Sequence, residues 1–229
     1  MGAISYIIEP DSVELDKSRG YETTSHKFIM RTTVLISDLL IFFTSILYFY
    51  QSYFNGLRNE HKSIGILIAL TVPGFLLIDH GHFQYNCVML GLSLYAITLG
   101  MNDRIGLGSI LFALALNYKQ MSLYYSLPMA LFYLRQSWHI AVKSSRNFPV
   151  DKRIFILWAE FGTIVLNGVA LFFFTTIVLW WPYISSVREI YRVIQRIFPF
   201  NRGIFEDKVA TFWCMLSTVI KIRDIVPTQ

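Results

Sequence analysis

Long apolar runs separated by short polar segments are the main pattern along the chain. They lie near residues 32–50, 64–78, 87–100, 106–118, 121–134 and 154–182. Several approach or exceed the roughly 20 apolar residues that cross a bilayer core, and others are shorter. The pattern predicts an all-α polytopic membrane protein with about six spans.

Composition agrees with this prediction. The 229 residues are 54% hydrophobic and 16% aromatic, and the mean hydropathy of +0.47 lies outside the range of an ordinary soluble domain. The net charge of +5 sits in short loops and tails beside apolar spans, so membrane topology explains it better than nucleic-acid binding. Acidic residues such as Glu9 and Asp11 near the N-terminus argue against a cleavable signal peptide.

The stretch Gly106 to Leu134 could form one long helix or two short ones, because "NYKQ" (117–120) interrupts it. Two passes put the loops 51–63, 101–105 and 135–153 on one face. Together these three loops contain the following basic residues: Arg58, Lys62, Arg104, Arg135, Lys143, Arg146, Lys152 and Arg153. The positive-inside tendency therefore favours two passes, with these loops cytosolic and "NYKQ" turning at the opposite face.

The segment after Pro182 has a different pattern. Apolar residues recur at helical spacing from Val187 to Phe198, with charged residues between them, which is typical of an amphipathic helix on a membrane surface. A charged stretch around "FNRGIFEDKVATFWC" follows. We therefore expect a luminal N-terminal segment (1–31), a transmembrane helix bundle (32–183) and a luminal amphipathic helix with a charged loop (184–229).

The polar stretch "LIDHGHFQYN" (77–86) stands between two apolar runs. Its side chains suit hydroxyl and phosphate groups as donors and acceptors: Asp79, His80, His82, Gln84, Tyr85 and Asn86. The alternative is an interfacial loop that only meets water and headgroups. A metal site that includes Cys87 is disfavoured, because structural zinc sites need four ligands at recurring spacings and catalytic ones at least three.

Lys119 lies between apolar runs, flanked by Asn117 and Gln120. A lysine at membrane depth is costly and usually faces a cavity or a partner, for which an anionic phosphate is suitable. Snorkelling to the interface is the alternative. Asp38 and Glu160 lie within spans and raise the same question more weakly, since either could pair with a basic residue on a neighbouring helix. Phosphate-loop, GxSxG, HExxH and CxxC motifs do not occur in the sequence.

Four segments, taken in their order along the chain, resemble the signature segments of a known family. "SRGYETTSHKFIMRTTVLISDLLI", "LIDHGHFQYN", "ALNYKQMSLYY" and "RIFPFNRGIFEDKVATFWC" look like signatures of the dolichyl-phosphate-glucose glucosyltransferases of the asparagine-linked glycosylation pathway in the endoplasmic reticulum. The pattern is most similar to the members that add the first glucose. The resemblance implies a partial GT-C type bundle with a luminal active site. It also implies α-1,3 transfer from dolichyl phosphate glucose to the dolichyl-diphosphate-linked high-mannose oligosaccharide, without metal or nucleotide cofactor.

The resemblance also implies a role for each candidate site residue. Lys119, Asn117 and Gln120 are expected to contact the donor phosphate, and the polar side chains of residues 79–86 to shape the site. Four charged residues are expected to order a loop over it: Arg202, Glu206, Asp207 and Lys208. The family's catalytic base lies in an acidic luminal loop that Met1 to Asp16 does not match, so the catalytic residue stays unassigned and this chain is expected to be a middle portion of the enzyme.

Two other functions remain open from the sequence. The first is a noncatalytic membrane protein that keeps the scaffold and binds lipid-linked sugars or a partner. The second, a transporter with Lys119 and the histidines lining its pathway, has less support because no internal repeat is visible.

Overall fold

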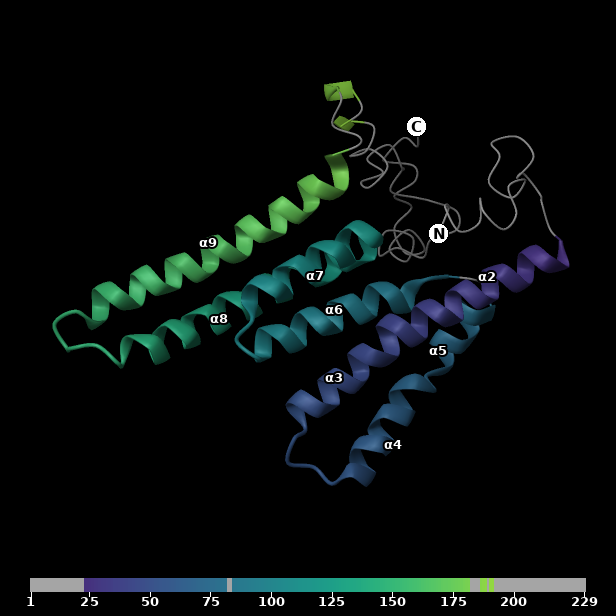
Figure 1. The fold of residues 1–229 in the computed structure, drawn as a ribbon, viewed down its shortest axis with the longest axis horizontal. Coiled ribbons are helices and arrows are strands. Elements are labelled where there is room, and N and C mark those ends of the chain that lie inside the picture. Colours follow the sequence, from purple (N-terminus) through teal and green to yellow (C-terminus); the bar gives the residue numbers. More distant parts are fainter. Residues whose placement is uncertain (1–22, 82–83, 182–185, 189, 192–229) are drawn as a thin grey trace, which may run out of the picture. The chain divides into compact units, whose positions relative to one another are not determined.

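The computed structural model of the chain describes residues 23–81, 84–181, 186–188 and 190–191, and all regular elements in those ranges are helical. The all-α prediction is confirmed for this part of the chain (Figure 1). Two compact units are distinguished, residues 1–178 and 179–229. The elements described below belong to the first, except that the last helix runs two residues into the second.

The first long helix is built from three consecutive pieces: α2 (Thr24–Ser37), the π-helical η2 (Asp38–Phe43) and α3 (Thr44–Tyr53). It begins at Thr23, whose hydroxyl accepts a hydrogen bond from the backbone N–H of His26 at 3.0 Å. This satisfies one of the donors that a helix start leaves without an intrahelical partner.

The second apolar segment is bent. It comprises α4 (Asn59–Leu70), the short α5 (Pro73–Phe75) and the π-helical η3 (Leu76–Gly81). Val72 leaves the helical region, with φ −59° and ψ 119°, because the ring of a following proline disfavours helical backbone in the residue before it. The polar residues from Asp79 onward therefore come at the end of a membrane-length segment.

Helices α6 (Asn86–Met101) and α7 (Ile105–Tyr118) form an antiparallel hairpin (Figure 1). Asp103 in the turn adopts φ 62°, a conformation that aspartate tolerates better than most residues. Gly108 allows the close approach of the helices, because a Cβ there would lie 2.9 Å from the carbonyl oxygen of Ala96. The Tyr133 hydroxyl donates to that same carbonyl at 3.0 Å.

The chain breaks at "NYKQ" as predicted. Helix α7 ends at Tyr118, Lys119 is extended with φ −147° and ψ 125°, and the 3-10 helix η4 (Gln120–Tyr125) leads into α8 (Ser126–Ser145). The expected loop at 135–153 was placed too early, since α8 continues to Ser145 and only the residues before α9 (Arg153–Trp180) connect the two helices. The flexible stems of Arg (three methylenes) and Lys (four) let these residues stay helical at an interface while their charges reach water.

The helices account for all six predicted apolar runs. Three are long and apolar enough to cross a membrane, at Thr24–Tyr53, Asn59–Gly81 and Arg153–Trp180, while Asn86–Met101 and Ile105–Tyr118 are shorter apolar helices. Length and composition thus support a polytopic membrane protein. Of the predicted amphipathic helix only 186–188 and 190–191 are described, with the backbone N–H of Ile190 donating to the Ser186 carbonyl at 3.1 Å; the remainder lies outside the described residues.

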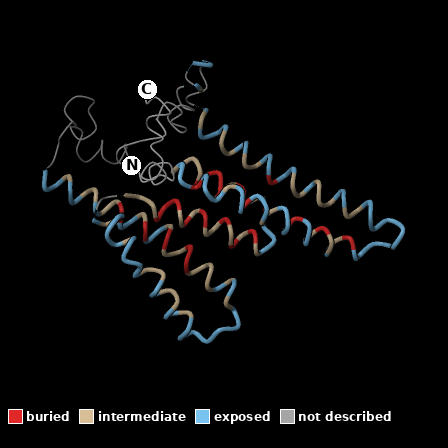
Figure 2. Tube along the Cα trace, turned by 180° about the vertical axis from the view of Figure 1, so that it is seen from behind, coloured by how far each residue is buried: buried red, intermediate tan, exposed pale blue. Residues whose placement is uncertain are grey.

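Burial is concentrated on α6 and the helices beside it (Figure 2). Helix α4 has no buried residue and α9 has only Gly168. Large apolar side chains such as Leu166 (70%) and Phe174 (64%) are mostly exposed. Such a surface fits lipid rather than water, because apolar outer faces are unfavourable in water and ordinary within a bilayer.

Candidate functional site

The polar end of the bundle is organised around the buried carboxylate of Asp79. This residue ends the second apolar segment and is 0% exposed. Its Oδ2 accepts from the backbone N–H of Cys87 at 2.6 Å, and its Oδ1 accepts from the Asn86 side-chain amide at 2.7 Å. A carboxylate at the start of α6 is favourable, because the first N–H groups of a helix lack intrahelical partners and carry partial positive charge.

Two other residues of the stretch face the first long helix. His80 Nε2 lies 3.0 Å from Asp38 Oδ2, and the Tyr85 and Thr33 hydroxyls lie 2.9 Å apart. Asp38 is therefore paired with a basic residue of a neighbouring helical segment, as predicted. These contacts tie His80 to η2 and Tyr85 to α2, and no sequence pattern indicated these partners.

Gln84 and Asn86 face the opposite way, toward the break between α7 and η4. The Lys119 ammonium donates to Asn86 Oδ1 in a short hydrogen bond and to Gln84 Oε1 at 3.5 Å. The Asn86 amide also donates to Gln84 Oε1 at 3.1 Å. "LIDHGHFQYN" and "NYKQ" thus lie at the same end of the bundle, as the charge pattern predicted.

The residues beside Lys119 point elsewhere or lie exposed. The Asn117 amide donates to the Ala113 carbonyl at 2.8 Å and to the Thr176 hydroxyl at 3.3 Å, which links α7 to α9. Gln120 is exposed at the start of η4. Glu160, expected to pair with a basic residue, accepts from the Ser144 hydroxyl at 3.4 Å.

Several predicted site residues lie outside the described part of the chain. His82 lies in the gap at 82–83, and four more lie beyond residue 191: Arg202, Glu206, Asp207 and Lys208. Their predicted roles stay predictions.

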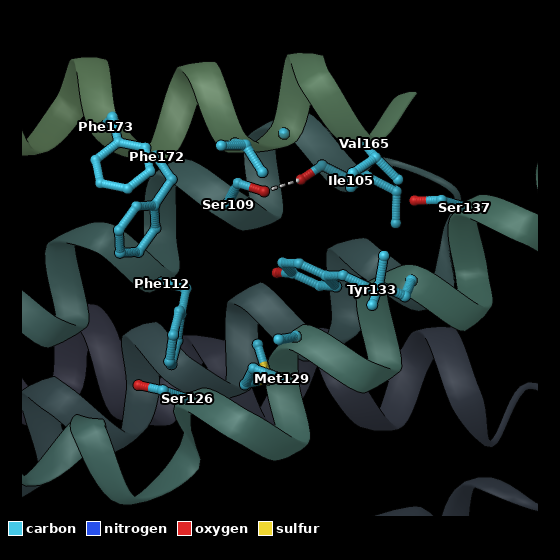
Figure 3. A pocket seen from close by; sticks show the side chains of 14 residues that line it. Ile105, Ser109, Phe112, Ser126, Met129, Tyr133, Ser137, Val165, Phe172 and Phe173 are labelled. Carbon is cyan, nitrogen blue, oxygen red and sulfur yellow. Dashed lines mark hydrogen bonds between the residues drawn. The ribbon is translucent and has the colours of Figure 1, made fainter. Parts of the chain in front are cut away.

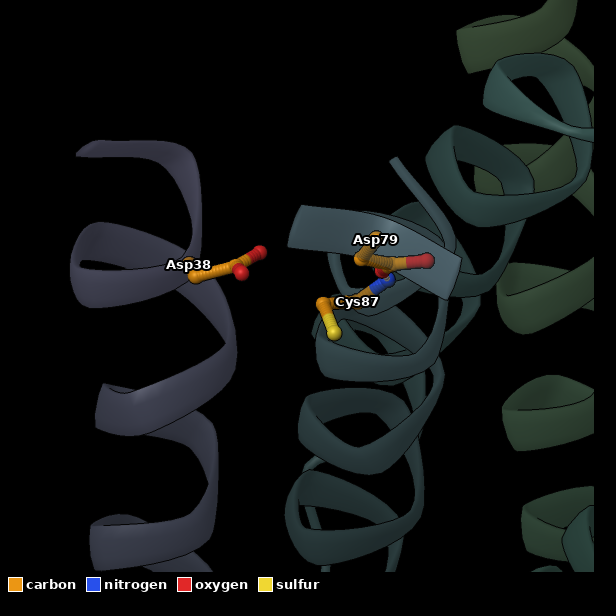
Figure 4. Close-up of side chains that lie close together, drawn as sticks. All are labelled: Asp38, Asp79 and Cys87. Carbon is orange, nitrogen blue, oxygen red and sulfur yellow. Dashed lines mark hydrogen bonds between the residues drawn. The ribbon is translucent and has the colours of Figure 1, made fainter. Parts of the chain in front are cut away.

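The structure also brings together a group of possible metal ligands. Ligand atoms of Asp38, Asp79 and Cys87 lie within 4.8 Å of one another, and Figure 4 shows Asp38 pointing from its helix toward the other two. Both Asp79 oxygens and Asp38 Oδ2 already have partners, while the buried Asp38 Oδ1 has none among the described residues. The Cys87 thiol also hydrogen-bonds with the two carboxylates, so the group offers fewer free ligand atoms than the three protein ligands of a catalytic zinc.

A cavity of about 380 Å³ opens between α7, α8 and α9 (Figure 3). Its walls are mostly apolar, with Phe112, Met129 and Phe172 among them. The Ser109 hydroxyl in the wall already donates to the Ile105 carbonyl at 3.0 Å. This chemistry suits a hydrocarbon chain and not a phosphate, because a charged group would lose its hydration there without compensation.

Comparisons with known proteins agree with the sequence signatures. The model of the ALG6, ALG8 glycosyltransferase family matches residues 1–229. A Dictyostelium discoideum protein named as a probable dolichyl pyrophosphate Man9GlcNAc2 alpha-1,3-glucosyltransferase is 43% identical over 229 residues, covering 100% of this chain and 42% of its own length.

Two further relatives carry the same activity in their names. A Gallus gallus protein is 41% identical over 226 residues, covering 99% of this chain and 41% of its own length. An Arabidopsis thaliana protein named as a probable enzyme of this kind is 38% identical over 231 residues, covering 100% of this chain and 40% of its own length. The chain therefore spans 40–42% of the length of these relatives. From the family match over its whole length, the chain belongs to the ALG6, ALG8 glycosyltransferase family.

Proposed function

We propose that the chain is the part of a glucosyltransferase that binds the donor phosphate. The whole enzyme would transfer the first glucose from dolichyl phosphate glucose to the lipid-linked Man9GlcNAc2 oligosaccharide, in α-1,3 linkage and with inversion at the anomeric carbon. We place this enzyme in the endoplasmic reticulum membrane, with the end that holds Lys119 at the lumen. The proposed division is a luminal segment (1–31), a membrane bundle (32–183) and a luminal segment (184–229).

The observation that supports this proposal is the environment of Lys119. Its ammonium is held by the amide oxygens of Asn86 and Gln84, and within the described ranges it takes part in no ion pair with a carboxylate. A cation held by neutral oxygens keeps its charge available to an anion. An ammonium has three N–H donors, so one remains for a phosphate oxygen.

In the proposed reaction the bond between the anomeric carbon and the donor phosphate oxygen breaks as the acceptor oxygen attacks. The acceptor proton passes to a base that we leave unassigned, and dolichyl phosphate departs. Negative charge grows on the departing phosphate, and a preorganised cation stabilises it. Lys119 would supply this cation, with Gln120 beside it and the amide of Asn117 reoriented toward the phosphate.

The test is Lys119→Ala in the full-length protein, in microsomes from cells that lack the endogenous enzyme. We expect glucose transfer to fall by about a hundredfold or more, as when one donor to a developing anion is removed, with normal expression. Lys62→Ala is the matched control, because Lys62 also donates to a neutral oxygen, the Asn55 carbonyl at 3.5 Å, but lies in the first turn of α4, away from "LIDHGHFQYN" in the sequence.

Two outcomes would change the proposal. Transfer at the unmodified rate with Lys119→Ala would reject the phosphate role. If the 229-residue chain binds dolichyl phosphate glucose but restores no transfer where the full-length protein does, this chain acts as a binding protein without turnover.

A further inference from the structure

The contacts of Asn86 indicate how Lys119 is kept without a carboxylate partner in the part of the chain that the structure describes. Asn86 lies between the two charged groups: its amide nitrogen donates to Asp79, and its amide oxygen accepts from Lys119. Asp79 is fully buried, whereas Asn86 and Lys119 are half-buried. One neutral amide thus separates a buried anion from the cation proposed to meet the donor.

The chemistry of the groups fixes this orientation. An ionised carboxylate only accepts hydrogen bonds, so the NH2 end of the Asn86 amide must face Asp79 and the oxygen must face the other way. The reversed amide would set oxygen against carboxylate and NH2 against ammonium, losing two charge-assisted hydrogen bonds. Asp79 is itself held in place by the backbone N–H of Cys87 at 2.6 Å.

We propose that Asp79 is a positioning residue, which acts through Asn86 to hold Lys119 by amide oxygens and so leave its charge available to the donor phosphate. This inference rests on the proposed role of Lys119. Asp79 would thus contribute to donor binding without touching the substrate. Its complete burial prevents direct contact with the substrate.

An exchange variant separates this role from a purely structural one. In D79N/N86D the two side chains trade their charge and keep the hydrogen bonds to each other and to Cys87: the new amide oxygen at 79 accepts from the Cys87 N–H, and its NH2 donates to the new carboxylate at 86. The hydrogen bond from position 86 to Gln84 Oε1 is lost. The net charge is unchanged. The difference is that Lys119 now faces a carboxylate, which competes with the donor phosphate for its charge.

The test compares the exchange variant with the unmodified protein. It measures kcat and the KM for dolichyl phosphate glucose in microsomes, and the midpoint of thermal unfolding of the purified protein. The expected result is a rise in KM of about tenfold or more, the scale of one charge-assisted hydrogen bond, with the midpoint retained. A purely structural Asp79 would leave KM unchanged, because the exchange preserves the hydrogen bonds that join position 79 to the Cys87 N–H and to position 86.

A second variant tests the inference if the exchange variant does not fold. Gln84→Glu places a carboxylate at the oxygen that lies 3.5 Å from Lys119 Nζ without touching Asp79, and the same rise in KM is expected. An unmodified KM in either variant overturns the inference. If Lys119→Ala is impaired while these variants bind the donor normally, only the positioning role is wrong; if Lys119→Ala is also normal, the proposed function is wrong.

Discussion

Replacement of Asp79 by alanine should destabilise the protein far more than removal of an exposed acid at another helix start. Asp79→Ala deletes the acceptors of two hydrogen bonds, 2.6 Å from Cys87 N and 2.7 Å from the Asn86 amide. Because Asp79 is 0% exposed, water does not readily replace it. The Cys87 N–H and the Asn86 NH2 would lose a strong acceptor in a region shielded from solvent.

The magnitude follows from these two bonds. Hydrogen bonds to charged groups contribute about 1.5–3 kcal/mol each, and alanine also relieves the cost of burying a carboxylate, which offsets part of the loss. We expect a net loss of about 2–4 kcal/mol. For a chain of this size that corresponds to a fall in the thermal midpoint of roughly 5–15 °C.

The assay is thermal unfolding of the detergent-purified protein, followed by tryptophan fluorescence. Asp79→Asn keeps one acceptor for Cys87 N and should lose about 1 kcal/mol. Glu60→Ala is the matched control: Glu60 lies in the first turn of α4, and its only described ion pair, with Arg58 at 3.1 Å, is exposed, so about 0–1 kcal/mol is expected. If Asp79→Ala and Glu60→Ala shift the midpoint equally, the carboxylate does not stabilise α6 and the reasoning fails.

Two further predictions concern packing and the tie to the first helix. Gly108→Ala should cost about 1–3 kcal/mol, because its Cβ would lie 2.9 Å from the Ala96 carbonyl oxygen, while Gly162→Ala, with nothing within 4 Å, should gain about 0.5–1 kcal/mol; equal midpoints would refute the close approach. His80→Leu should cost about 1–3 kcal/mol, because it leaves Asp38 without its 3.0 Å partner, and adding Asp38→Asn should recover most of the loss; additive losses in this double-mutant cycle would contradict the pairing.

The apolar segments could be read from the sequence because a membrane span needs only length and hydrophobicity. The break at "NYKQ" was also predictable, since charge bias in the loops demanded two passes there. The end of α8 was not, because Lys and Arg can continue a helix beyond the bilayer and composition does not mark where it stops.

The candidate site was likewise predictable from the sequence only in part. The sequence determined which residues are costly in a membrane, namely Asp38, Lys119 and Glu160, since charge near a bilayer must find a partner whatever the fold. It could not choose the partners, because hydrogen bonds depend on atoms a few ångströms apart and on which residues face each other across helices. Only the tertiary structure paired Asp38 with His80 and set Asn86 between Asp79 and Lys119.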